Sequence, residues 1–234
     1  MITTLNIETS GKICSVALCQ DGAIEFQRDD TEGMQHANRL PVFVEECMEE
    51  IHRRDMPLDA VAVSMGPGSY TGLRIGLSLA KGLAFSLGVP LIGVDTLKII
   101  AVKAMFGVHD LQGDEILVPM VDARRMEVYT GAYDFALNEV IKPQAMIITP
   151  GSFSELEGRK VIFMGDGAAK TKDVITLPGA RWIDSLLPMA KDMMALSEKA
   201  FREKDFIDTA YSVPRYLKEY QTTVARNPLE KKLH

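Results

Sequence analysis

The chain has 234 residues, of which 47% are hydrophobic and 25% charged, and this is the composition of a soluble globular protein with one large domain or two small ones. Its net charge of −6 excludes a general surface that holds nucleic acid by neutralising phosphates, so a partner would have to supply most of that binding. The first ten residues lack the basic and apolar pattern of a signal peptide, and no run of about 20 apolar residues spans a bilayer. Three cysteines without a CxxC pair predict reduced, structural thiols and a cytoplasmic protein; they are Cys14, Cys19 and Cys47.

The first part of the chain reads as three strands followed by alternating helices and strands. Short apolar runs separated by turn residues predict the strands, and apolar residues at helical spacing predict the helices. Pro41 falls either in the first turn of its helix or at a kink. The expected strands are 2–8, 13–19, 23–28, 60–64 and 89–94, and the expected helices are 35–52, 71–87 and one that opens at Asp95 and Thr96.

The second part of the chain repeats this order of strands, loop and helix without a repeat in the sequence itself. We therefore expect an α/β protein with mixed sheets flanked by helices, divided into residues 1–106 and 107–234, the latter ending in a mildly basic tail. The expected elements are strands 116–121, 126–133, 142–148 and 161–164, a turn at 122–125 and an amphipathic helix at 189–204.

The helix 71–87 carries small residues at four-residue spacing. A glycine inside a helix costs about 1 kcal/mol relative to alanine, so a soluble helix that keeps several needs a close approach by a neighbour. That neighbour is either this chain's own sheet or a second protein, and the sequence leaves both open. One row is Gly72, Gly76, Ala80 and Ala84, and a second row is Ser78, Gly82 and Ser86.

A small-residue hairpin at 7–12 is the first candidate for a ligand site. Backbone amides and hydroxyls of Thr9, Ser10 and Gly11 can cradle a phosphate, although an ordinary hairpin has the same composition. The glycine-rich turn at 65–76 is not a P-loop, because no Gly-Lys-Ser/Thr ends it. Ser69 or Thr71 is expected to cap the helix that follows.

Metal ligands and catalytic groups do not form a pattern. No HxxxH, HExxH, cysteine pair or GxSxG elbow is present, so we predict neither a metal site nor a catalytic residue. His36 stands at a helix start and is expected to be a surface or interface residue. Arg124 and Arg125 in a turn either hold a phosphate or a partner's carboxylate or are merely solvated.

Four blocks of the sequence resemble the TsaB (YeaZ) family. The stretch 66–76, GPGSYTGLRIG, is similar to that family's most diagnostic run. The other three are 7–18, 121–129 and 214–217. The family's usual opening has aspartate where this chain has Glu8. Leu40 stands where the catalytic relatives carry the second histidine of an HxxxH pair that begins at His36.

The resemblance implies a two-lobed actin-like, Hsp70-like and sugar-kinase-like fold. It implies a non-catalytic subunit that pairs with the related TsaD protein, which transfers threonylcarbamoyl to adenosine in tRNA, within a larger complex that includes a TsaE-type ATPase. No cofactor is expected for the chain alone, whereas ATP or ADP is expected at the complex interface and tRNA only through the complex. The rivals are a metal-dependent peptidase or small-molecule kinase on the same fold, and a homodimer. The residues expected to contact the partner are His36, Leu40, Phe43, Gly72, Gly76, Ala80 and Gly82.

Overall fold

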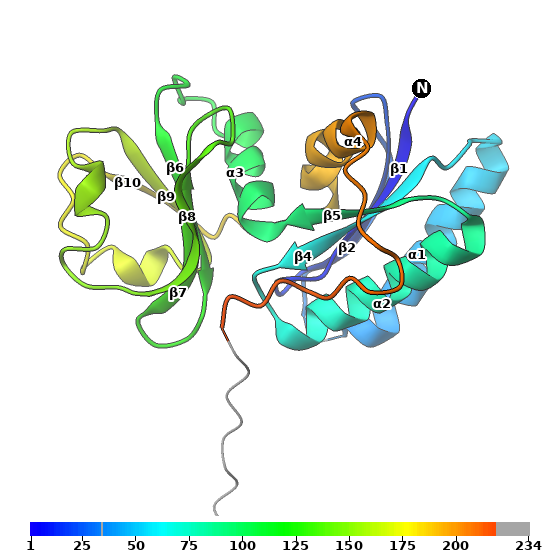
Figure 1. The fold of residues 1–234 in the computed structure, drawn as a ribbon, viewed down its shortest axis with the longest axis horizontal. Coiled ribbons are helices and arrows are strands. Elements are labelled where there is room, and N and C mark those ends of the chain that lie inside the picture. The colour runs from blue at the N-terminus through cyan, green and yellow to red at the C-terminus, as the bar shows by residue number, and fades with distance from the viewer. Residues whose placement is uncertain (34, 219–234) are drawn as a thin grey trace, which may run out of the picture.

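The computed structural model describes residues 1–33 and 35–218, and these form two lobes that are each built on a five-stranded sheet (Figure 1). The first sheet has the strand order β3-β2-β1-β4-β5. Its first three strands form an antiparallel meander, and β4 and β5 then run parallel to β1. The strands are β1 (Thr3–Glu8), β2 (Cys14–Gln20), β3 (Ala23–Asp30), β4 (Ala60–Gly66) and β5 (Leu91–Asp95).

The second sheet repeats the topology of the first. Its order is β10-β9-β6-β7-β8, with an antiparallel meander from β6 to β8 and with β9 and β10 parallel to β6. The expected echo of the first block is thus confirmed as two copies of one strand order, without a repeat in the sequence. The strands are β6 (Ile116–Asp122), β7 (Glu127–Tyr133), β8 (Glu139–Ile147), β9 (Val161–Gly165) and β10 (Arg181–Asp184).

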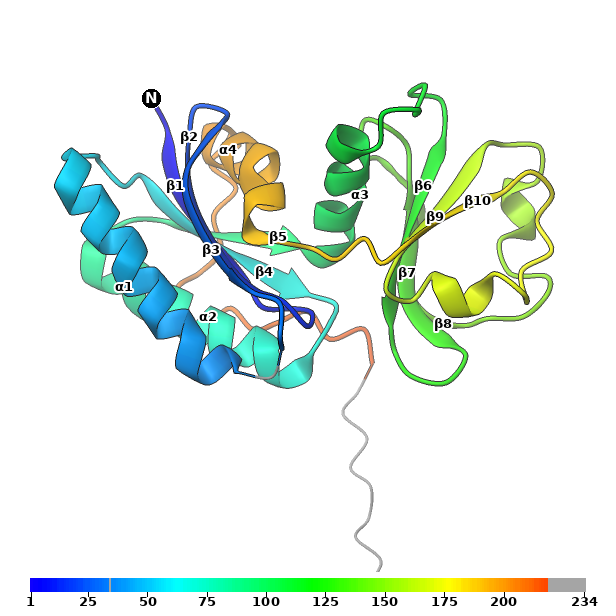
Figure 2. The same cartoon turned by 180° about the vertical axis from the view of Figure 1, so that it is seen from behind.

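Two long helices cover one face of the first sheet. They are α1 (His36–Arg54) and α2 (Tyr70–Leu87), and they lie side by side in both views (Figures 1 and 2). The Ser69 hydroxyl accepts a hydrogen bond from the Gly72 amide at 3.2 Å, so Ser69 is the cap of α2. Pro41 lies inside α1 rather than in its first turn.

Two further helices each pack against the sheet of the lobe that they do not follow in the chain. Helix α3 (Thr96–Gly107), capped by Asp95, follows the first sheet but packs its Leu97, Ile100 and Ala104 against the second. Helix α4 (Met194–Glu203) follows the second sheet but packs against β1 and β5 of the first. The expected unit 107–234 therefore does not coincide with the second lobe, because the chain returns to the first lobe after β10. The predicted basic tail beyond Lys218 lies outside the described residues.

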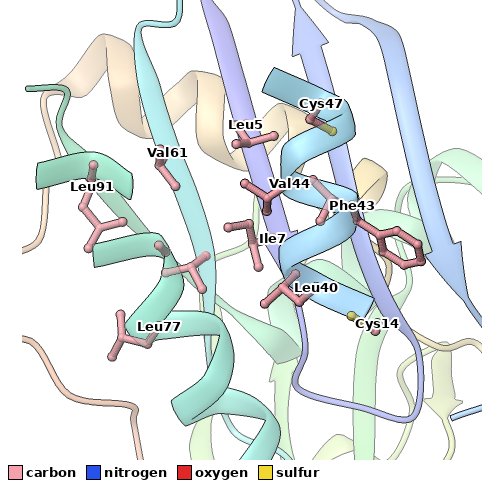
Figure 3. Close-up of a cluster of buried hydrophobic side chains, with 14 residues drawn as sticks. Leu5, Ile7, Cys14, Leu40, Phe43, Val44, Cys47, Val61, Leu77 and Leu91 are labelled. Atoms are coloured by element: carbon pink, nitrogen blue, oxygen red, sulfur yellow. The ribbon is translucent and has the colours of Figure 1, made fainter. Parts of the chain in front are cut away.

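The core of the first lobe lies between its sheet and the two long helices (Figure 3). Strand residues Leu5 and Ile7 meet Leu40 and Val44 of α1, and all four are buried. The cysteines are free and buried: Cys14 joins this core, whereas Cys19 lies on the opposite face of the sheet, as strand parity predicts.

The expected elements match the observed ones closely, with two exceptions. Strand β10 was not predicted, because its four residues, RWID, are too few and too charged at the ends to show a period. The helix expected at 189–204 begins as a 3-10 turn, η3 (Ala190–Met193), before α4 starts at Met194. Two further 3-10 turns are η1 (Ser154–Leu156) and η2 (Ala169–Thr171).

Candidate functional site

The hairpin expected to cradle a phosphate is occupied by the chain's own groups. The Thr9 amide donates to the Ser64 hydroxyl at 3.3 Å, and the Ser10 amide donates to the Glu8 carboxylate. The Ser10 carbonyl accepts from the Ser69 amide at 2.7 Å. Both amides that an anion would need at Thr9 and Ser10 are therefore already engaged within the chain.

The glycine-rich turn and the start of α2 lie directly on this hairpin. A Cβ atom on Gly72 would stand 2.1 Å from the Thr9 carbonyl oxygen, and one on Gly76 would stand 2.2 Å from the Thr9 hydroxyl. The Thr9 hydroxyl also donates to the Gly72 carbonyl at 2.8 Å. Contact with Thr9, the residue that follows β1 in the same chain, is thus the reason for these two helix glycines.

The second small-residue row of α2 faces outward. Outside its own helix, no described residue has a heavy atom within 4 Å of a Cβ atom placed on Gly82. Phe85, one turn further along, is 83% exposed, and Val42 of α1 is 46% exposed. The outer face of α1 and α2 therefore carries both an unexplained helix glycine and large apolar side chains; we call this surface the α1–α2 face, defined by Val42, Ser78, Gly82, Phe85 and Ser86.

Most of the residues expected to contact a partner lie inside this chain instead. Leu40 and Phe43 belong to the core between α1 and the sheet, because the apolar stripe of α1 faces inward. The row containing Gly72, Gly76 and Ala80 is buried against the chain's own strands. His36 is partly exposed at the start of α1, and Gly82 is exposed. Of the predicted contact residues, His36 and Gly82 are the two that a second protein can reach in this conformation.

Glu8 is a fully buried carboxyl at the end of β1. Burial raises its pKa to about 7, against the lowering effect of the hydrogen bond that it accepts from the Ser10 amide. Its second oxygen and the Ser10 hydroxyl have no hydrogen-bond partner among the described residues. This carboxyl can hold a proton at neutral pH.

A cleft of about 580 Å³ separates the lobes on the side where the described chain ends. The rings of Tyr70 and Tyr216 stack with their centroids 5.0 Å apart, and the guanidinium of Arg74 lies 4.1 Å from the centre of the Tyr70 ring. The Arg74 Nε atom also donates to the Tyr216 hydroxyl at 3.0 Å. The cleft is lined by 67–71, 122–124, Tyr129 and 215–218.

The cations at this cleft largely pair with carboxylates of the same chain. Arg215 donates to Asp95 at 3.0 Å. Lys218 donates to Glu127 at 2.7 Å and so ties the end of the described chain to the second lobe. Burial raises the pKa of Asp95, and its bonds with the start of α3 and with Arg215 oppose this.

The sequence did not predict this cleft, although it contained the signal. All four blocks that carry the family resemblance meet near this cleft. Three of them contribute lining residues, namely 66–76, 121–129 and 214–217. The fourth, 7–18, contacts the turn at 66–72 through Thr9 and Ser10. Tyr70, Tyr129 and Tyr216 each lie in one of these blocks, so the assumption that the blocks meet in space would have grouped the three tyrosines at one site.

Within residues 1–33 and 35–218, no three His, Cys, Asp or Glu side chains are close enough together to hold a metal ion. None of the helices in the described part of the chain is long and apolar enough to cross a bilayer.

Comparison with known proteins decides the family. The family model for TsaD, tRNA N6-adenosine threonylcarbamoyltransferase, matches residues 32–226. Two TsaB proteins, named for tRNA threonylcarbamoyladenosine biosynthesis, match nearly end to end. That of Bacillus subtilis is 31% identical and that of Escherichia coli 30%, covering 93% and 92% of this chain and 94% of each relative. The chain belongs to the TsaB family.

Solved structures agree with this assignment. YeaZ from Pseudomonas aeruginosa superimposes with a TM-score of 0.77 at 28% identity, covering 93% of this chain and all of that one. Another structure, of a protein described as similar to the peptidase YeaZ from the same organism, gives a TM-score of 0.80 at 27% identity. The expected two-lobed α/β fold, with two mixed sheets flanked by helices, is confirmed, and its placement in the actin-like, Hsp70-like and sugar-kinase-like group stays a prediction.

Proposed function

We propose that the chain is a non-catalytic subunit in tRNA threonylcarbamoyladenosine biosynthesis and that it docks through the α1–α2 face onto a TsaD paralogue. The names of its relatives supply the process. One observation supports the docking surface: Gly82 costs helix stability, and outside its own helix no described residue has an atom within 4 Å of a Cβ placed there. A helix from a second protein that packs closely at this position would require a residue without a side chain, and this explains the glycine.

Exposed apolar residues on the outer sides of α1 and α2 support the same surface. Phe85 at 83% exposure and Val42 at 46% bring hydrocarbon to the outer side of two adjacent helices. Aromatic side chains of this kind are typical anchors at protein interfaces. The family model for TsaD matches most of this chain, so a TsaD paralogue is expected to share its strand and helix order. Two similar proteins can then pack their paired helices against each other, and a homodimer would use the same face when the paralogue is absent.

We expect nucleotide and tRNA to bind to the complex and not to this chain alone. The two amides of the hairpin at Thr9 and Ser10 are engaged internally, so ATP or ADP is expected at the interface with the paralogue and not in this hairpin. The net charge of −6 supports tRNA binding through the partner. A TsaE-type ATPase completes the proposed complex, and we expect it to act in the cytoplasm.

The docking surface is tested with a charge placed on it. Phe85→Asp puts a carboxylate on the α1–α2 face, one turn after Gly82. Ile147→Asp makes the same kind of change on β8 of the other lobe, where Ile147 is 70% exposed. Binding of each variant to the TsaD paralogue of the same organism is measured by calorimetry, and threonylcarbamoyladenosine formation is measured with the complete set of proteins and tRNA.

We expect Phe85→Asp to weaken binding by at least about tenfold, or about 1.4 kcal/mol, and to lower modification in proportion. Ile147→Asp is expected to leave both unchanged. If Phe85→Asp folds and binds normally, the docking surface is elsewhere. If the wild-type chain is dispensable for modification, the proposed role is wrong.

A further inference from the structure

A second pocket, of about 420 Å³, lies on the opposite side of the first lobe from the α1–α2 face. It opens between the C-terminal half of α3 and the junction of η3 with α4, and the edge strand β3 contributes Ile24. Its volume falls within the range of about 300–1,000 Å³ that is usual for small-molecule sites. Nothing in the proposed role of the chain uses it.

The walls of this pocket are hydrocarbon. Val102 and Phe106 stand one turn apart on α3, and Met194 and Ala195 face them from the start of α4. Phe106 is 74% exposed and Ile24 is 46% exposed at the mouth. The rest of α3 is covered by the second sheet and by the first, so its last turn is where the helix leaves apolar surface open.

The charged side chains that line the pocket, two lysines and one aspartate, carry a net charge of about +1. Lys103 donates to Asp192 at 2.9 Å, and the same Asp192 oxygen accepts from the Met189 amide at 3.0 Å, so this ion pair is fixed in place. Lys191 adds a second ammonium from η3. Two ammonium groups against one carboxylate complement a single anionic group on an otherwise apolar ligand.

We propose that this pocket binds a small amphiphilic monoanion, a carboxylic acid with a medium-length alkyl or single aromatic body. The hydrocarbon lies against Val102, Phe106 and Met194, and the carboxylate is held by the ammonium groups of Lys191 and Lys103. This site is independent of the docking surface, so it stands or falls separately from the proposed function.

The test is a calorimetric titration of the full chain with decanoate, with decanol as the uncharged probe of the same length. We expect one saturable site for decanoate, tighter than about 1 mM, and binding of decanol at least about tenfold weaker. Two variants probe the pocket: Ala195→Trp fills it from its exposed rim, and Lys191→Glu reverses the charge at its mouth. Lys199→Glu is the control, because Lys199 is a 70% exposed lysine on α4 that forms an ion pair with Glu203 and does not line the pocket.

The proposal predicts that Ala195→Trp abolishes the decanoate site, that Lys191→Glu weakens it by at least about tenfold, and that Lys199→Glu changes it by less than about twofold. Circular dichroism establishes that each variant is folded, and if Ala195→Trp is not, Lys191→Glu decides. The proposal is overturned if decanoate shows no saturable binding. It is equally overturned if decanol binds as well as decanoate, or if the folded pocket variants bind like the wild type.

Discussion

The two small-residue rows of α2 should respond in opposite ways to a bulky side chain. Gly76→Leu adds a Cβ atom that would stand 2.2 Å from the Thr9 hydroxyl, where ordinary contact begins near 3.4 Å. Gly82→Leu adds its side chain where no other heavy atom lies within 4 Å of the new Cβ. One substitution therefore tests packing inside the chain, and the other tests packing against a partner.

The magnitudes follow from these distances. Replacing a helix glycine with leucine gains up to about 1 kcal/mol in helix propensity at either position. At Gly76 the overpacking costs about 1–3 kcal/mol or more, because the Thr9 side chain, which is held by its hydrogen bond to the Gly72 carbonyl, must give way. Gly82→Leu should then leave the free energy of unfolding unchanged or raise it by up to about 1 kcal/mol, whereas Gly76→Leu should lower it.

The assay pairs denaturant unfolding with calorimetric binding to the TsaD paralogue. Gly82→Leu should weaken binding by more than about 1 kcal/mol, since the added side chain holds the two helices apart. Gly151→Leu serves as the control, because Gly151 also has no neighbour within 4 Å of a built Cβ but lies in the second lobe. A Gly82→Leu variant that is stable and binds with unchanged affinity would refute the claim that a second protein approaches this glycine.

Three further outcomes follow from buried groups and from one cap. Burial raises the pKa of Glu8 to about 7 from the model-compound value of 4.5, so the folded state binds the extra proton and the wild type loses stability as pH rises through this window. Glu8→Gln has no carboxyl to ionise and so does not lose this stability. The unfolding free energy of the variant minus that of the wild type should therefore increase by about 2–3 kcal/mol between pH 5 and pH 8. A difference that does not change with pH would contradict the raised pKa. Ser69→Ala removes the hydroxyl cap of α2 and should cost about 1 kcal/mol in denaturant unfolding, and no loss would show that the cap is idle. Burial raises the pKa of each cysteine thiol to about 12, so a thiol reagent should label Cys14, Cys19 and Cys47 only on unfolding, and rapid labelling of the native chain would show that one is accessible.

Local patterns in the sequence were sufficient to predict most helices and strands, but not to predict which residues those elements contact. The strands of the first sheet are bounded by turn residues, and α2 is bounded by Ser69 and Gly88, so both could be located from sequence. Helix α2 is apolar nearly all round, and for that reason its periodicity could not tell which glycine row faces the sheet. The contact of Thr9 with Gly72 and Gly76 joins positions more than sixty residues apart and is visible only in three dimensions.

The exchange of α3 and α4 between the lobes was also beyond the sequence. Both helices have apolar sides that any sheet can bury, so composition does not specify the partner sheet. The cleft depends on the same long-range arrangement, because Tyr216 reaches Tyr70 only after the chain has returned to the first lobe.

Hydrogen–deuterium exchange of the chain, alone and in complex with the TsaD paralogue, tests the docking surface most directly. We expect slower exchange in α1 and α2, residues 36–54 and 70–87, with the strands of the second sheet unchanged. Protection confined to the second lobe, or no change in either helix on formation of a stable complex, would contradict it.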